Sequence, residues 1–86
     1  GMNNPAPLPA SGTALAVSRF AVPGMRCAGC ISKLENGLAA VPGIAAARVN
    51  FTAKQVQVSH DADLDVPALV KAFAGLGFDA SPLGDV

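Results

Sequence analysis

The chain has 86 residues, which leaves room for one small domain and excludes a second domain with its own core. Six Lys and Arg balance six Asp and Glu, and the four Phe are the only aromatic residues. This composition excludes nucleic acid as a partner, because basic and stacking surfaces are missing. No stretch approaches the roughly 20 apolar residues of a membrane helix, so we expect no membrane insertion.

The N-terminal residues predict a leader without a folded element. Gly1 before Met2 looks like a residue left by tag removal, so we expect Met2 to be the native start. Residues 2–13 carry three prolines, no charge and no hydrophobic period, a composition that cannot offset the entropy lost on ordering. We also expect no secretion signal here, because no basic region precedes a continuous apolar stretch. We therefore expect residues 1–13 to form a flexible leader.

Residues 14–43 predict a strand and a helix that flank a cysteine loop. Residues 14–22 alternate in polarity, with Phe20 and Val22 on one face, and Pro23-Gly24 ends this strand. Beyond the cysteines, apolar residues recur every three or four positions. These residues are Ile31, Leu34, Leu38 and Val41. The spacing predicts an amphipathic helix that ends at Pro42-Gly43.

The next residues predict a β-hairpin. One face of its first strand is apolar and comprises Ala45, Ala47, Val49 and Phe51. After a turn at residues 52–54, Val56 and Val58 alternate with polar residues, which predicts the second strand.

A second helix and a short last strand complete the predicted elements. Asp65 is placed to cap the helix, Pro67 stands in its first turn, and Gly75 follows its apolar stripe. That stripe comprises Val66, Leu69, Val70 and Phe73. Phe78, Ala80 and Pro82 then alternate, and the proline favours an edge strand. We expect residues 84–86 to form a C-terminal tail.

The predicted order is β-α-β-β-α-β. This order predicts an α+β, ferredoxin-like sandwich over residues 14–83, with two helices on one face of a four-stranded antiparallel sheet. Many unrelated activities share this fold, so function has to be argued from the cysteines.

Cys27 and Cys30 are the candidate metal ligands. Cys30 is expected in the first turn of the helix and Cys27 just before it, where the helix dipole and free N–H groups favour thiolates. Two converging thiolates without a third ligand suit a soft, low-coordinate ion such as Cu(I), whereas Zn(II) prefers four donors. An ion held by two exposed thiolates also stays open to a partner's thiolates, which favours transfer over storage.

Three other interpretations of the cysteine pair remain open. The first is a redox dithiol, the second is half of a zinc site, and the third is two incidental cysteines in an interaction domain. The redox interpretation fits poorly, because a thioredoxin-like βαβ unit is missing, and the sole histidine, His60, cannot complete a zinc site alone.

The segment from Gly24 to Cys30 resembles the GMxCxxC signature of heavy-metal-associated domains. The resemblance covers roughly residues 14–83 and includes Val41-Pro42-Gly43-Ile44, Val49-Asn50-Phe51 and Gly77-Phe78-Asp79-Ala80. It implies a ferredoxin-like domain that binds Cu(I) through Cys27 and Cys30. Other soft ions, namely Hg(II), Ag(I) and Zn(II), are alternatives.

Within this family the chain looks most like the N-terminal domain of a bacterial copper-transporting P-type ATPase. On that reading the 86 residues are a piece that is not itself an enzyme, on the cytoplasmic side of the cell membrane, while the parent drives copper transport with ATP. The implied partners are a cytoplasmic copper chaperone or other domains of the ATPase. We expect a monomer, with a metal-bridged dimer as an alternative. A free cytoplasmic chaperone and a mercury-binding protein are the alternative functions.

Several residues near the cysteines invite a role. Strand alternation and the family resemblance place Met25 in the core beneath the loop and not on the metal. The resemblance places Phe78 near the loop, where it shields the site or simply packs in the core. Some relatives carry a lysine at this position, which implies that it neutralises the negative charge of a thiolate complex. Here the remaining candidates for that neutralisation are the helix dipole, Arg26 and Lys33.

The remaining candidates are assigned no metal. We interpret Asp61, Asp63 and Asp65 as turn and cap residues. His60 is expected at the surface, at a strand end, without a role.

Overall fold

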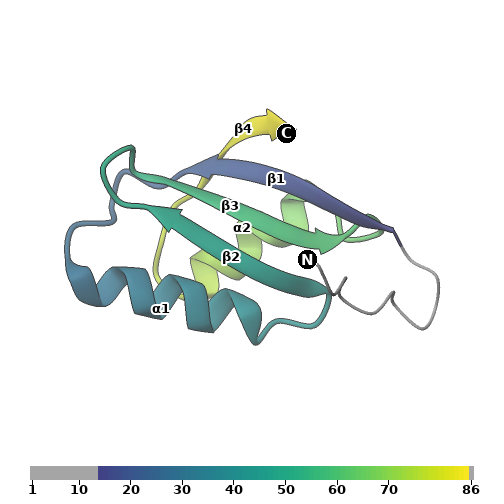
Figure 1. The fold of residues 1–86 in the computed structure, drawn as a ribbon, viewed down its shortest axis with the longest axis horizontal. Coiled ribbons are helices and arrows are strands. Elements are labelled where there is room, and N and C mark those ends of the chain that lie inside the picture. The colour runs from purple at the N-terminus through teal and green to yellow at the C-terminus, as the bar shows by residue number, and fades with distance from the viewer. Residues whose placement is uncertain (1–13, 86) are drawn as a thin grey trace, which may run out of the picture.

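The computed structural model describes residues 14–85 and confirms the predicted order of elements (Figure 1). The elements are β1 (Leu15–Ala21), α1 (Ala28–Ala39), β2 (Ile44–Asn50), β3 (Gln55–Asp61), α2 (Val66–Gly75) and β4 (Ser81–Asp85). The predicted leader, residues 1–13, lies outside the described residues, as does Val86. No helix within residues 14–85 is long and apolar enough to cross a membrane.

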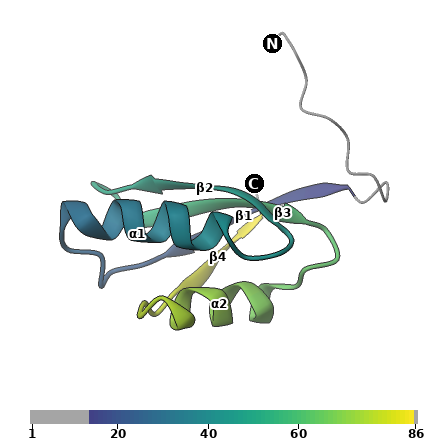
Figure 2. The same ribbon diagram turned by 90° about the horizontal axis from the view of Figure 1, so that it is seen from below.

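The four strands form one antiparallel sheet in the order β2-β3-β1-β4. Both helices pack on the same face of the sheet, and within residues 14–85 no helix covers the opposite face (Figure 2). This is the predicted ferredoxin-like sandwich. Because β1 and β3 occupy the centre, the loop that follows β1 emerges beside the hairpin turn between β2 and β3.

The core lies between the sheet and the helices. Its buried apolar residues are Phe20, Val22, Met25, Leu34, Leu38, Ile44, Val56, Val58, Leu69, Phe73 and Phe78. The rings of Phe20 and Phe73 join β1 to α2, with centroids 5.0 Å apart and a tilt of 53°. The predicted cap of α2 is confirmed, because Asp65 Oδ1 accepts a hydrogen bond from the Ala68 N–H at 3.0 Å.

The two helices approach each other closely at Gly37 of α1. A Cβ atom at this position would lie 2.6 Å and 2.8 Å from the two Cδ atoms of Leu76, at the end of α2. Gly37 therefore fits because it has no side chain.

The prediction that Ala45 shares a core face with Ala47 is wrong. Ala45 is exposed, and Ile44 is buried in its place. The cause is a shift in register between β2 and β3, where Ile44 pairs with His60 but Ala46 pairs with Ser59. Such a bulge adds one residue to β2 and reverses the alternation on one side of it.

The last strand lies further along the chain than predicted. It begins at Ser81 instead of Phe78, and its residues Gly84 and Asp85 pair with β1. The expected tail at residues 84–86 is therefore wrong for these two residues. The predicted edge position of Pro82 is confirmed, since β4 pairs with β1 alone.

The expectation that His60 lies at the surface is wrong as well. The side chain is only 3% exposed, because the alternation that buries Val56 and Val58 continues to this residue. Its Nδ1 lies 2.8 Å from the Asp61 carbonyl oxygen and its Nε2 lies 2.8 Å from Ser18 Oγ. A carbonyl only accepts, so Nδ1 carries a proton, and in a neutral ring Nε2 accepts from the hydroxyl. The buried ring is thus fully hydrogen-bonded, as buried polar groups generally are.

Candidate metal centre

The start of α1 brings the two cysteines together. Cys27 is the N-cap residue, with extended backbone angles of φ −142° and ψ 161°, and Cys30 is the third residue of the helix. Their sulfur atoms lie 2.8 Å apart, and both are free thiols. Because the Cys27 side chain does not cap the helix by a hydrogen bond, its sulfur remains available to a ligand.

The loop before α1 is anchored on one side and open on the other. Met25 is fully buried in the core, which confirms its predicted place beneath the loop. Arg26, Cys27 and the next two residues are exposed, and Cys30 is partly exposed. The sulfur atoms are therefore accessible from solvent while the chain beside them is fixed.

The pKa of the Cys30 thiol lies below its ordinary value, which increases the thiolate fraction at neutral pH. The largest cause is the hydrogen bond with Cys27, followed by backbone hydrogen bonds from Arg26 and Cys27. The charge of Lys33 lowers the pKa further, whereas burial opposes these effects. Arg26 therefore acts on this thiol through its main chain.

Lys33 supplies a cation beside the loop from the second turn of α1. Its Nζ lies 5.7 Å from the centroid of the Phe78 ring, a geometry that allows a cation–π contact. Phe78 itself is 9% exposed and belongs to the core, so core packing explains the position of its ring.

Lys54 is a residue near this site that the sequence analysis missed. Its Nζ donates a hydrogen bond to the Met25 carbonyl oxygen at 2.7 Å and lies 3.7 Å from the centroid of the Phe51 ring. Its own carbonyl oxygen accepts from the Val22 N–H at 2.8 Å. The two hydrogen bonds tie the β2–β3 turn to the segment that leads into the cysteines. Lys54 adopts a left-handed φ of 56°, which no side-chain pattern indicates.

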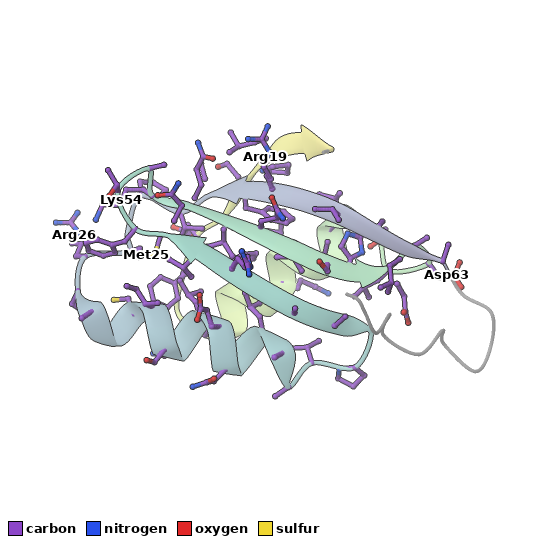
Figure 3. All side chains as sticks on the ribbon, in the orientation of Figure 1. Arg19, Met25, Arg26, Lys54 and Asp63 are labelled. Atoms are coloured by element: carbon purple, nitrogen blue, oxygen red, sulfur yellow. The ribbon has the colours of Figure 1, made fainter. Side chains whose placement is uncertain are left out.

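The other candidate residues lie away from the cysteines. Asp63 is at the opposite end of the molecule from Met25, Arg26 and Lys54 (Figure 3). Within residues 14–85 no group of three or more His, Cys, Asp or Glu is placed to hold a metal ion. The candidate centre is thus the cysteine pair alone, a donor set that suits a soft ion of low coordination number.

A βαββαβ sandwich with an exposed cysteine pair at the start of its first helix defines a class of small metal-binding domains. The family model described as "Heavy-metal-associated domain" matches residues 19–79. The chain therefore belongs to the heavy-metal-associated domain family.

Known proteins of this family resemble the chain at moderate identity. "Copper-transporting ATPase 2" of Rhizobium meliloti is 36% identical over 73 residues, which cover 85% of the chain and 8% of that protein. A solved N-terminal domain of a potential copper-translocating P-type ATPase from Bacillus subtilis, in its Cu(I)-loaded state, is 30% identical. That match covers 85% of this chain and 92% of the other, with a TM-score of 0.76.

Oxidized MerP from Ralstonia metallidurans is a further structural match. It is 30% identical with a TM-score of 0.75, and the match covers 83% of this chain and all of that one. The chain thus spans less than a tenth of the ATPase but nearly the whole of each small domain.

Proposed function

We propose that this domain binds Cu(I) through Cys27 and Cys30 and passes it on by thiolate exchange. The observation that carries the proposal is the pair of exposed, converging sulfur atoms without a further His, Cys, Asp or Glu close enough to complete a larger ligand set among residues 14–85. Two thiolates satisfy Cu(I), but they leave Zn(II) two donors short of its usual four. The lowered pKa of Cys30 supports the proposal, because the thiolate is the form that binds metal.

Transfer follows from the openness of the same loop. In each exchange the Cys27 sulfur binds the copper ion and a thiolate of the donor protein leaves it. One Cu–S bond therefore breaks for each one that forms, and copper stays in the Cu(I) state. The exposure of Cys27 favours this residue as the first to receive the ion, with Cys30 completing the pair. We propose a copper chaperone, or another domain of the same protein, as the partner in this exchange.

We further propose that the domain is the N-terminal, cytoplasmic part of a copper-transporting P-type ATPase. The support is the similarity to a copper-transporting ATPase, of which the chain spans only 8%, and to a solved N-terminal domain of a potential copper-translocating P-type ATPase. The domain would carry no ATPase activity of its own. The alternative is a free copper chaperone. Sequencing the gene beyond Val86 distinguishes the two, because an ATPase continues into membrane helices.

A titration against a chromogenic Cu(I) chelator under reducing conditions tests the metal assignment. We expect one Cu(I) per chain, and Cys27→Ser and Cys30→Ser should each abolish strong binding. Met25→Leu is the matched control, because it keeps the apolar volume in the core and removes only the thioether. Strong binding by either serine variant, or its loss in Met25→Leu with the fold intact, would contradict the proposal.

Hg(II) is the second candidate ion, because two thiolates also suit this soft ion. Challenging the Cu(I)-, Hg(II)- and Zn(II)-loaded domain with the same concentration of a small thiol tests this alternative. We expect Cu(I) to be retained at a thiol concentration that removes Zn(II). Retention of Hg(II) together with ready loss of Cu(I) would favour the mercury-binding alternative.

A further inference from the structure

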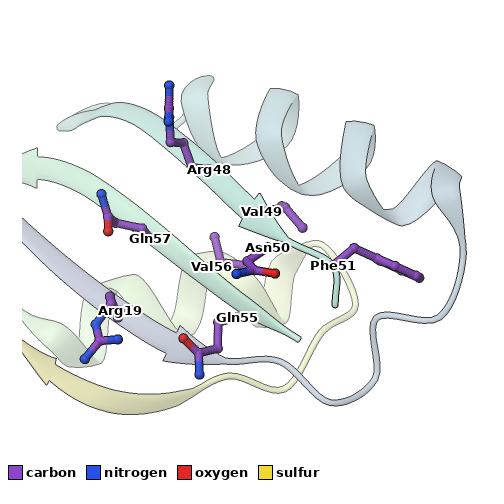
Figure 4. A pocket seen from close by; sticks show the side chains of 8 residues that line it. All are labelled: Arg19, Arg48, Val49, Asn50, Phe51, Gln55, Val56 and Gln57. Carbon is purple, nitrogen blue, oxygen red and sulfur yellow. The ribbon is translucent and has the colours of Figure 1, made fainter. Parts of the chain in front are cut away.

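The face of the sheet opposite the helices carries a shallow polar concavity of about 550 Å³ across β1, β3 and β2 (Figure 4). Two of its eight lining residues are arginines, Arg19 and Arg48, three carry side-chain amides, and none is acidic. These polar side chains face outward because their neighbours along the strands face the core. The concavity is therefore a cationic surface that neither α1 nor α2 covers.

The two arginines stand at the ends of a row across the sheet. Gln57 of β3 pairs with Arg19 of β1 on one side and with Arg48 of β2 on the other. Because neighbouring strands lie about 4.8 Å apart, the two arginine Cα atoms are separated by roughly 10 Å. Figure 4 shows the guanidinium groups at opposite ends of this row. The row thus offers two separate anion-binding positions with an amide between them.

Arg19 has an unsatisfied donor in the free chain. Among the side chains that the structure describes, its Nε–H is buried without a hydrogen-bond partner. An unpaired buried donor of a charged group is costly. Because this Nε has almost no solvent-accessible area, a carboxylate reaches it only when the Arg19 side chain turns outward, where Nε and a terminal nitrogen can donate to the carboxylate together. The orphaned donor is an observation independent of the charge pattern, and it favours such a turn toward an acceptor.

We propose that this surface, defined by Arg19, Arg48 and Gln57, docks an acidic segment of a partner protein in an extended conformation. In an extended polyproline II conformation a chain rises about 3.1 Å per residue with three residues per turn, so carboxylates three residues apart lie on one side of the peptide and match the spacing of the two arginines. A single small anion would reach one guanidinium at a time. The Gln57 amide lies where it can bond the peptide backbone between them. Neither Cys27 nor Cys30 lines the concavity, so the inference is independent of metal binding.

Binding of a designed peptide to the metal-free, 86-residue chain tests the proposal. The probe is a labelled ten-residue peptide with Glu at every third position among Gly and Ser, and its control carries Gln instead. Amide chemical shifts should move at Arg19, Arg48 and Gln57, and added salt should weaken binding. The Arg19→Gln/Arg48→Gln double variant should bind about tenfold more weakly. Lys71→Gln, an exposed charge on α2, should bind as the unaltered chain does.

Several results would overturn the proposal. These are no binding, equal binding of the Gln peptide, or shifts confined to the loop around Arg26. Displacement of the peptide by an equal concentration of inorganic phosphate would assign the surface to small anions. Shifts of the same amides with protein concentration alone would assign it to a second copy of this chain. Arg48→Gln alone keeps the test valid if the double variant unfolds, because Arg48 is exposed.

Discussion

Replacing Lys54 by Met tests whether the β2–β3 turn holds in place the loop that carries the cysteines. The substitution keeps most of the aliphatic stem but removes the ammonium group. Lost with it are the hydrogen bond to the Met25 carbonyl at 2.7 Å and the contact with the Phe51 ring at 3.7 Å. The hydrogen bond joins the hairpin turn to the loop before α1, and the contact with Phe51 holds Lys54 within the turn, so their loss should loosen the loop.

The size of the effect follows from these two contacts. A hydrogen bond to a charged group contributes about 1.5–3 kcal/mol, and the lower end applies because Lys54 is only half-buried. A partly exposed cation–π contact adds about 0.5–1 kcal/mol. We therefore expect Lys54→Met to lower the free energy of unfolding by about 2 kcal/mol. In a domain of this size, that loss lowers the Tm by about 8–16 °C.

Thermal unfolding followed by circular dichroism measures this change. Lys71→Met is the matched control, since Lys71 is exposed on α2, and it should stay within about 0.5 kcal/mol of the unaltered chain. Lys54→Gly removes the same contacts but relieves the positive φ of 56°, so it should be about 1 kcal/mol more stable than Lys54→Met. Equal Tm values for the two Lys→Met variants would refute the reasoning.

Two further substitutions test the site and the helix contact. Lys33→Gln removes a charge that lowers the pKa of Cys30, so the midpoint of iodoacetamide alkylation at Cys30 should move to higher pH. This shift of the midpoint should be small, because the hydrogen bond with Cys27 lowers the pKa of Cys30 more than Lys33 does. An unchanged alkylation profile would contradict a contribution from Lys33. Gly37→Ala should gain less stability in urea unfolding than the about 1 kcal/mol expected from helix propensity, because the Leu76 side chain must shift to make room for the new Cβ. At Gly75 of α2 a Cβ meets nothing within 4 Å, so Gly75→Ala should not destabilise; equal effects at both glycines would be inconsistent with such a shift of Leu76.

The architecture could be predicted from the sequence because its signals are local. The alternation in β1, the apolar stripe of α1 and the Asp65 cap each depend on residues within one element. The errors occurred where pairing between strands decides the outcome. Ala45 is exposed because β2 carries a bulge opposite β3, and β4 reaches Asp85 because that end pairs with β1. Neither register is encoded in the polarity of the strand itself.

The cysteine pair was the part of the candidate site that the sequence could predict. Its spacing and its place before an amphipathic helix suffice to bring both sulfur atoms to one point. Lys54 and His60 could not be placed in this way, because their partners stand 29 and 42 residues away in the chain. A lone histidine after alternating valines did carry one signal, since the period of two continues through it into the core.

The contrast between Met25 and its exposed neighbours is what the proposed double role of this loop, as metal-binding site and point of transfer, requires. A ligand pair has to be held near its binding geometry, or the entropy of ordering it weakens every metal contact. Here the buried Met25 and the Lys54 hydrogen bond fix the loop from behind. A transferred ion must also remain open to a partner's sulfur, and Cys27 is exposed at the helix start. Rigidity and access are thus supplied by residues only two positions apart, so a change at Met25 should alter stability before it alters the identity of the bound metal.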